Sequence, residues 1–261
     1  MTAWPQELRD ALGPGRMGAP LGAGVHRATV AGEQIVVKTT AAAPDEADGL
    51  ERLRRVASGP RVPSVLYRSA TLLALEWIPA GARSPAGEEE LGRALAGLHG
   101  EGEPEWGGGS SWIGDCRVDP SGWAVAADFY GARLTSLAGR CGLDGPVARV
   151  VDRLGELIPP GRPVLVHGDL WWGNVLWAAD GHPAVIDPSV HGGHPEEDLA
   201  MLALFGAVPD RLLGTYAERR PLAEGWLSRV ALWQLYPLLV HSVVFGDSYR
   251  ASARAVAERY G

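Results

Sequence analysis

The chain has 261 residues, of which 46% are hydrophobic and 21% charged, and this composition predicts a globular protein of one large or two small domains. Its formal net charge of −7 at pH 7 argues against nucleic acid or an anionic membrane as the main partner.

The first residues and the cysteines favour a location in the cytoplasm. Residues 1–7 lack the basic and apolar regions of a signal peptide, and no apolar run reaches membrane-spanning length. Cys116 and Cys141 show no metal-binding spacing, and two cysteines do not make the framework of four or six that is typical of a disulfide scaffold. We expect a cytoplasmic protein, and we expect a monomer or a weak dimer.

The N-terminal segment predicts a short helix, a glycine-containing turn and a strand. Residues 1–13 carry apolar side chains at helical spacing. Gly22 and Gly24 then precede a strand-like segment, and glycines at such a place let the backbone approach nucleotide phosphates closely. Arg27 occupies the third glycine position of a GxGxxG pattern, so a flexible turn is an equal alternative to a phosphate-binding loop.

A predicted strand over residues 34–38 ends at Lys38, the only lysine among 24 basic residues. Its compact ammonium suits phosphate oxygens at a place where the wider guanidinium of arginine fits less well. In the helix predicted over residues 45–57, Glu46 shares the apolar face and therefore needs a partner, for which Lys38 is the natural candidate. The alternatives are a surface lysine and a glutamate that interacts only with the helix dipole.

A break between strands and helices divides the chain. Strands are predicted over 65–67 and 72–78, and a Pro-Ala-Gly-Ala segment follows at 79–82. We therefore expect an N-terminal lobe of residues 1–79 and a larger helical lobe of residues 80–261, which makes the fold class α+β. The helices expected in the second lobe cover residues 85–99, 129–134, 147–158, 198–205, 211–216 and 226–241.

The chemistry is concentrated in one polar loop. A short apolar strand, residues 164–166, leads into a loop that carries His167, Asp169 and Asn174. The segments on either side of Asp180-Gly181 predict a hairpin, so Asp187 should return close to this loop.

These residue types suit phosphoryl transfer from a nucleotide that carries a metal ion. The five-residue interval from Asp169 to Asn174 is the spacing of a kinase catalytic loop. We expect Asp169 to accept the proton of an attacking hydroxyl, and Asn174 and Asp187 to bind Mg²⁺, with ATP as the second cofactor. The alternative is a polar turn beside an ordinary strand-end carboxylate.

Residues 191–198 offer a different metal chemistry. They contain two histidines and three carboxylates, which could hold Zn²⁺ or Fe²⁺. Two glycines and Pro195 prevent a helix from presenting both histidines, and no second histidine-rich segment lies nearby. The sequence therefore favours a kinase over a metal hydrolase.

Together these motifs resemble the fructosamine kinase (ketosamine 3-kinase) family, which belongs with the aminoglycoside and choline kinases. The resemblance covers most of the chain and is carried by His167-Gly-Asp-Leu-Trp-Trp-Gly-Asn174, Asp187-Pro-Ser189, Gly193–Met201, Leu204–Gly206 and the segment 229–249. It implies a two-lobed, protein-kinase-like fold with ATP in the cleft.

The resemblance also implies roles for individual residues. Glu76, Trp77 and Ile78 would form the hinge whose backbone binds adenine, and Asp198 would brace the catalytic loop. The other residues implied in contacting the substrate or bracing the loop are His167, Trp171, His194 and Glu196.

The acceptor implied by the resemblance is the 3-hydroxyl of a ketosamine, a sugar joined by glycation to a small or protein-bound amine. Trp171 and Trp172 would suit stacking on a sugar, or they could lie in the core. Two alternatives remain. An aminoglycoside or amino-alcohol kinase would keep every catalytic residue, whereas a protein that only binds ATP would be expected to lose one, and none is lost.

Overall fold

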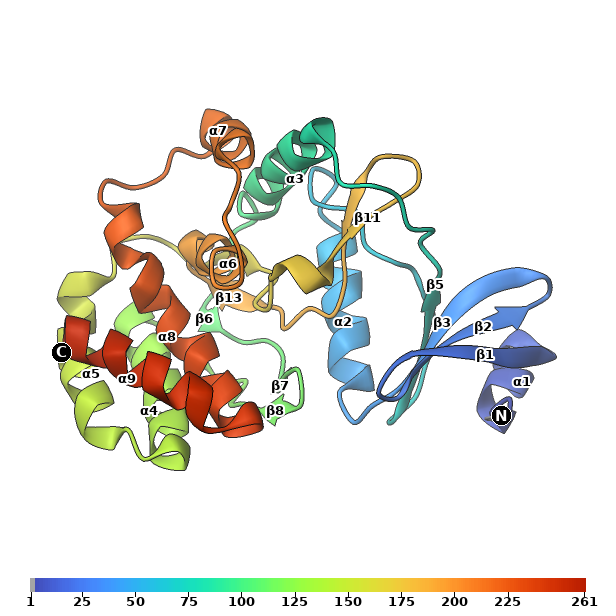
Figure 1. The fold of residues 1–261 in the computed structure, drawn as a ribbon, viewed down its shortest axis with the longest axis horizontal. Coiled ribbons are helices and arrows are strands. Elements are labelled where there is room, and N and C mark those ends of the chain that lie inside the picture. Colours follow the sequence, from blue (N-terminus) through green and yellow to red (C-terminus); the bar gives the residue numbers. More distant parts are fainter. Residues whose placement is uncertain (1–2) are drawn as a thin grey trace.

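The computed structural model describes residues 3–261, and its N-terminal part is built on an antiparallel sheet (Figure 1). The five strands lie in the order β1-β2-β3-β5-β4. Two helices, α1 (Gln6–Leu12) and α2 (Ala43–Arg54), accompany them. The strands are β1 (Gly15–Gly22), β2 (Val25–Val30), β3 (Glu33–Thr39), β4 (Val65–Arg68) and β5 (Leu72–Glu76).

The two helices cover opposite faces of this sheet. Ile35 and Val37 of β3 pack in a cluster with Leu8 of α1, whereas Val36 between them packs in the cluster that contains α2. Successive side chains of a strand point to opposite faces, so Lys38 emerges on the same side as Val36. The strand period therefore directs the single lysine toward α2.

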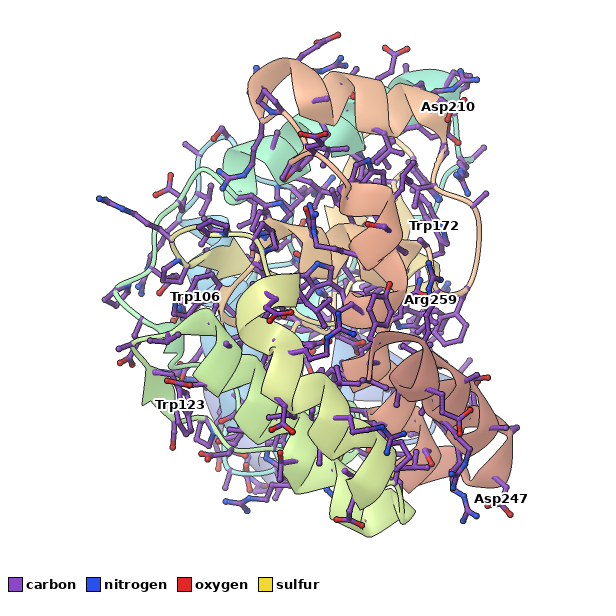
Figure 2. The ribbon with its side chains drawn as sticks, turned by 90° about the vertical axis from the view of Figure 1, so that its left-hand side faces the viewer. Trp106, Trp123, Trp172, Asp210, Asp247 and Arg259 are labelled. Carbon is purple, nitrogen blue, oxygen red and sulfur yellow. The ribbon has the colours of Figure 1, made fainter. Side chains whose placement is uncertain are left out.

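The rest of the chain is mainly helical (Figure 1). Helices α4, α5, α8 and α9 share one hydrophobic cluster, while α3 packs against α7. Figure 2 shows this part from the side, with Asp210 at the start of α7 and Asp247 at the start of α9. The helices are α3 (Pro85–Leu98), α4 (Ala126–Cys141), α5 (Asp144–Leu157), α6 (Pro195–Leu202), α7 (Asp210–Arg219), α8 (Trp226–Phe245) and α9 (Asp247–Tyr260).

Short strands carry the loops between these helices. They form a sheet of order β10-β13-β6-β9 and the hairpins β7-β8 and β11-β12. A single 3₁₀ turn, Trp172–Asn174, precedes β11. The short strands are β6 (Trp106–Gly107), β7 (Trp112–Ile113), β8 (Cys116–Arg117), β9 (Gly122–Trp123), β10 (Val164–Val166), β11 (Val175–Trp177), β12 (Pro183–Val185) and β13 (His191–Gly193).

The α+β class is confirmed, but several elements were not expected from the sequence, among them the short strands β6 to β9, strand β1, strand β13 and helix α9. Strand β1 contains Pro20 and buries only Met17, so it lacks the alternation that identifies a strand. Strand β13 reads His-Gly-Gly and exists because it pairs with β10. Helix α9 follows α8 after the single residue Gly246, and the two helices pack against each other.

The hydrophobic core is continuous across the predicted lobe boundary at residue 79. That position falls between the end of β5 and the start of α3. One buried cluster nevertheless combines Leu50 of α2, Leu95 of α3 and Leu199 of α6. Within residues 3–261, no helix combines the length and the apolar character needed to cross a membrane.

Candidate active site

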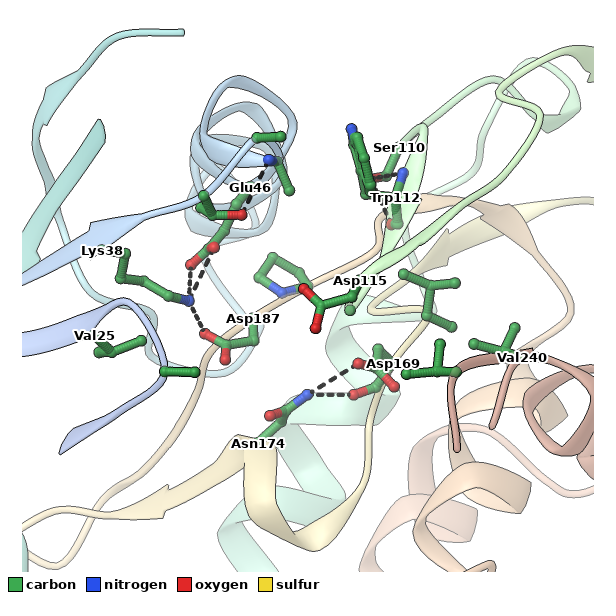
Figure 3. Close-up of a pocket in the computed structure, with 18 of the residues that line it drawn as sticks. Val25, Lys38, Glu46, Ser110, Trp112, Asp115, Asp169, Asn174, Asp187 and Val240 are labelled. Atoms are coloured by element: carbon green, nitrogen blue, oxygen red, sulfur yellow. Dashed lines mark hydrogen bonds and ion pairs between the residues drawn. The ribbon is translucent and has the colours of Figure 1, made fainter. Parts of the chain in front are cut away.

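A cavity of about 470 Å³ lies where the sheet and α2 face the catalytic loop and α8 (Figure 3). It brings together the predicted lysine, glutamate, aspartates and asparagine. The predicted site residues that line it are Lys38, Glu46, Asp169, Trp171, Asn174 and Asp187.

Lys38 links the sheet to both α2 and the loop after β12. Its Nζ lies 2.7 and 2.9 Å from the two carboxylate oxygens of Glu46 and 2.6 Å from Oδ1 of Asp187 (Figure 3). Burial alone would lower the pKa of Lys38, but attraction to Asp187 and Glu46 outweighs burial and raises the pKa. The ammonium therefore stays charged in a site where it is only 8% exposed.

The loop after β10 holds Asp169 and Asn174 in contact. Asn174 Nδ2 donates to the backbone oxygen of Asp169 at 2.8 Å and lies 3.4 Å from its Oδ2. Gly168 has φ +80°, and a Cβ there would lie 2.1 Å from the carbonyl oxygen of Ser189, so the turn requires glycine. Burial, and then the nearby charge of Asp187, raise the pKa of Asp169 to about 7.

Asp198 at the start of α6 holds the same loop from behind. Its carboxylate accepts hydrogen bonds from the backbone amides of His167 at 2.8 Å and Gly168 at 2.9 Å, and His99 Nε2 lies 3.1 Å away. Burial would raise the pKa of Asp198, but the hydrogen bond from His99 and the charge of the two histidines lower it. The His167 ring contributes on the other side of the loop, since its Nε2 lies 3.0 Å from the carbonyl oxygen of Ile186.

Asp187 adopts a backbone conformation that is unusual for a residue other than glycine. Its φ is +56°, in the left-handed region, and only Ala31 among the other described non-glycine residues has a positive φ. The following Pro188 disfavours the ordinary helical conformation at this position. Such strain is concentrated at functional sites, and here it presents the Asp187 carboxylate to the cavity.

The oxygen atoms of the loop fit a magnesium ion bound together with a nucleotide. The described residues contain no cluster of three or more His, Cys, Asp or Glu side chains able to hold a metal by themselves. Mg²⁺ usually takes one or two protein oxygens and completes its coordination with phosphates and water. Asp187 supplies a carboxylate. The bond from Asn174 Nδ2 to Asp169 leaves the Asn174 amide oxygen as a second ligand.

The glycine pair lies in a tight turn between β1 and β2. Gly22 pairs with Val25 across this turn, and Gly24 has φ +68°. A Cβ on Gly24 would lie 2.7 Å from the carbonyl oxygen of Thr39. The neighbouring residues Ala23 and Val25 line the cavity, so the turn borders the space around Lys38.

The predicted hinge lies outside this cavity. The Glu76 amide donates to the carbonyl oxygen of Ser64 at 2.9 Å, and its carboxylate is 2.9 Å from Arg61. The ring of Trp77 packs under the guanidinium of Arg27 at 4.5 Å, and Ile78 is buried. The amide of Glu76 is thus already used within the protein.

Two further predicted residues join helices rather than line the cavity. His194 caps the N-terminus of α6, and its ring stacks on that of Trp233 with the centroids 4.9 Å apart. Burial lowers the pKa of His194 to about 4. Glu196 binds Arg229 through two contacts of 2.6 and 2.9 Å and also accepts from Trp233 Nε1. They fasten α6 to α8.

The two adjacent tryptophans have different surroundings. Trp171 lines the cavity and is 39% exposed. Trp172 packs against the core cluster of α2 and α3, with the guanidinium of Arg83 4.3 Å from its ring. Only Trp171 therefore lies where a substrate can reach it.

Several cavity residues were missed from the sequence. Asp115 lies in the two-residue turn between β7 and β8 and reaches toward the catalytic loop (Figure 3). The Gly114-Asp115 pair signals a turn, but nothing in the sequence connects that turn to Asp169. The other missed residues are Ala23, Val25, Thr39, Thr40, Ala41, Ala42, Ser110, Trp112, Ile113, Gly114, Pro188, Val240, His241, Val244 and Phe245.

A strand lysine paired with a helix glutamate, facing an Asp-Asn loop across a cleft, is the arrangement of protein-kinase-like phosphotransferases. Comparison with solved structures agrees on the fold. The choline kinase of Streptococcus pneumoniae superimposes with a TM-score of 0.63 at 14% identity and covers 98% of this chain and 96% of its own.

Comparisons with more similar proteins identify the family within this class of phosphotransferases. A model of the family described as fructosamine kinase matches residues 34–260. A crystal structure of a candidate fructosamine-3-kinase from Thermobifida fusca is 35% identical, with a TM-score of 0.88 over 97% of this chain and 96% of the other. The chain belongs to the fructosamine kinase family.

Curated relatives carry related names. A probable ketoamine kinase from Enterococcus faecium is 32% identical over 234 residues, which cover 82% of this chain and 81% of the relative. The chloroplastic protein-ribulosamine 3-kinase of Oryza sativa subsp. indica is 31% identical over 211 residues, or 75% of this chain and 60% of the relative.

Proposed function

We propose that this protein transfers the γ-phosphoryl group of ATP to the 3-hydroxyl of a ketosamine, with fructosamines and ribulosamines as the substrate class. The observation that carries the proposal is the shared cavity in which Lys38 and Glu46 face Asp169, Asn174 and Asp187, in a chain that belongs to the fructosamine kinase family. The names of the relatives support the acceptor class.

Each residue of the cavity has a distinct proposed task. Asp169 accepts the proton of the acceptor hydroxyl, and the oxygen of that hydroxyl forms a bond to the γ-phosphorus of ATP. The bond between the γ-phosphorus and the bridging oxygen breaks, which releases ADP. Lys38, held by Glu46, binds the phosphate oxygens. Asp187 and Asn174 would hold Mg²⁺, which when bound neutralises phosphate charge.

The remaining assignments extend the same proposal to the nucleotide and to the whole chain. Residues 1–79 form the nucleotide-binding lobe and residues 80–261 the lobe for catalysis and the acceptor. The hinge that binds adenine lies outside the cavity around Lys38, and we assign it to the backbone of Trp77 and Ile78. The Glu76 amide is left out because it already donates to Ser64. We further propose a cytoplasmic monomer or weak dimer that uses free or protein-bound ketosamines.

The charge of the cavity suits a cationic acceptor. Four carboxylates line it, those of Glu46, Asp115, Asp169 and Asp187, against the single ammonium of Lys38. Lys38 contacts Glu46 and Asp187, so its ammonium does not pair with Asp115 or Asp169 on the acceptor side. A ketosamine carries a basic amine next to its sugar, so this field favours it over a neutral sugar. Aminoglycosides are cationic too, and the choice between the two acceptors rests on the family.

The site of phosphorylation tests the proposed reaction. With Mg²⁺ and ATP, the purified protein should phosphorylate a fructosyl- or ribulosyl-amine at sugar carbon 3, and much faster than kanamycin or choline. A pocket that binds the hydroxyls of a ketosamine leaves some of its own polar groups without hydrogen-bond partners when a different substrate occupies it. Phosphorus-coupled NMR of the product locates the phosphate. Phosphate at another carbon, or on an aminoglycoside alone, would contradict the acceptor assignment.

Replacing Asp115 by Asn tests the role of charge in acceptor binding. We expect KM for a ketosamine to rise about tenfold while KM for ATP changes little, because the variant removes one carboxylate that attracts the protonated amine of the ketosamine. Asp152→Asn is the matched control, since Asp152 is an exposed aspartate on α5 and does not line the cavity. Equal ketosamine KM values in the two variants would remove Asp115 from acceptor binding.

A further inference from the structure

Five aromatic side chains form a continuous cluster at the edge of the active-site cavity. The centroids of neighbouring rings lie 4.9 to 6.5 Å apart, mostly edge to face or tilted. The rings come from the catalytic loop, the segment after α6 and the corner between α8 and α9. We call this cluster the aromatic wall: Trp171, Phe205, His241, Phe245 and Tyr249.

Three of the five side chains in the aromatic wall are large, apolar and exposed to solvent. Phe245 is 66% exposed, Phe205 41% and Trp171 39%. Contiguous exposed apolar surface on a protein commonly marks a place of binding. Trp171, His241 and Phe245 line the same cavity as Asp169, so the open rings are continuous with the reaction site.

The aromatic wall is supported by the helices behind it. The His241 ring lies with its Nδ1 2.7 Å from the carbonyl oxygen of Pro237, one turn earlier in α8. Tyr249 packs against the helical core, and the centroid of its ring lies 4.9 Å from that of His241 and 6.0 Å from that of Phe245. Rings held in place in this way lose little conformational freedom when a ligand covers them.

On the basis of the function proposed above, we propose that the aromatic wall binds the amine carrier of the ketosamine. The reacting hydroxyl must lie at Asp169, and Trp171 follows only two residues later in the same loop. Trp171, His241 and Phe245 line the same cavity as Asp169, so a sugar placed at Asp169 can direct its nitrogen and carrier toward them. Aromatic faces attract both an ammonium group and an apolar chain. The enzyme therefore selects ketosamines whose carrier is aromatic or apolar.

Two adducts of the same sugar test this selection. Wild-type enzyme should phosphorylate fructosyl-benzylamine with a kcat/KM about tenfold above that of fructosyl-methylamine, because only the benzyl group covers the rings. Phe245→Ala should reduce this ratio to about twofold or less, and Phe245→Tyr should restore most of it. Leu227→Ala is the matched control: Leu227 is 71% exposed at the other end of α8, outside the cavity, and its loss should leave the ratio unchanged.

Calorimetric binding of both adducts separates failure of the inference from failure of the proposed function. Equal affinities in wild type, or an equal loss of affinity in Phe245→Ala and Leu227→Ala, would overturn the aromatic subsite. Tighter binding of the benzyl adduct without turnover of either adduct would keep the subsite and overturn the proposed reaction. Sedimentation of the same samples tests whether a second copy of this chain, rather than a substrate, covers the aromatic wall. If Phe245→Ala dissociates a dimer and leaves the kcat/KM ratio intact, the rings form an interface between copies and the aromatic subsite is overturned.

Discussion

Asp169→Asn lowers kcat for ketosamine phosphorylation by about 10²- to 10⁴-fold, the range typical of a lost general base. The substitution is nearly isosteric, so the contact with Asn174 and the backbone of the loop should persist. Burial and Asp187 raise the pKa of Asp169 to about 7, which makes this carboxyl a better proton acceptor than an ordinary aspartate. A steady-state assay of ADP release at saturating ATP and ketosamine measures the effect.

Nucleotide affinity is the control for this variant, because Asp169 is assigned to the hydroxyl rather than to phosphate or metal. Calorimetry with Mg·ATP should give a Kd within about threefold of wild type, a change of less than 1 kcal/mol. A turnover within a few-fold of wild type would contradict the assignment of the base. A large loss of ATP affinity would instead move Asp169 to the nucleotide side of the cavity.

Lys38→Arg reduces kcat/KM for ATP by about 10²-fold although it keeps the positive charge. The Lys38 ammonium is almost enclosed and sits between carboxylate oxygens of Glu46 and Asp187 at 2.6 to 2.9 Å. A guanidinium is wider and planar, so it cannot replace a compact ammonium there without displacing one of the carboxylates. Kinetics at varied ATP concentration measure the loss.

A partner substitution and a stability measurement accompany this variant. Glu46→Gln should lower kcat/KM for ATP in the same direction but less, because Lys38 keeps its contact with Asp187. Thermal unfolding of both variants shows whether the fold survives the change in a buried pair. Near-normal activity of a folded Lys38→Arg protein would show that the site does not depend on an ammonium.

Local spacing was enough to predict that the central residues of the candidate site lie together. The interval between Asp169 and Asn174 is set within one loop, and the hairpin β11-β12 brings Asp187 back beside it. Lys38 and Glu46 each lie on a predictable face of their element, and strand and helix periods make those faces meet. Such arrangements depend on neighbours in sequence, so a pattern reveals them.

The acceptor side of the cavity could not be predicted from local sequence patterns. Asp115 and Phe245 are 130 positions apart in the sequence and share a cavity only because the hairpin β7-β8 packs near α8. No periodic pattern encodes that contact. Strand β13 was missed for a similar reason, since a His-Gly-Gly segment becomes a strand only through pairing with β10. Tertiary packing decides these features.

The single lysine has a consequence for the protein's own exposure to sugars. Glycation begins at free amines, and the ε-amine of lysine is the one that proteins offer in quantity. Here 23 of the 24 basic side chains are arginine, and the ε-amine of Lys38 is enclosed between two carboxylates. A protein proposed to act on sugar adducts of amines thus presents almost no lysine for such adducts to form on. Its folded surface is a poor target for the damage proposed as its substrate.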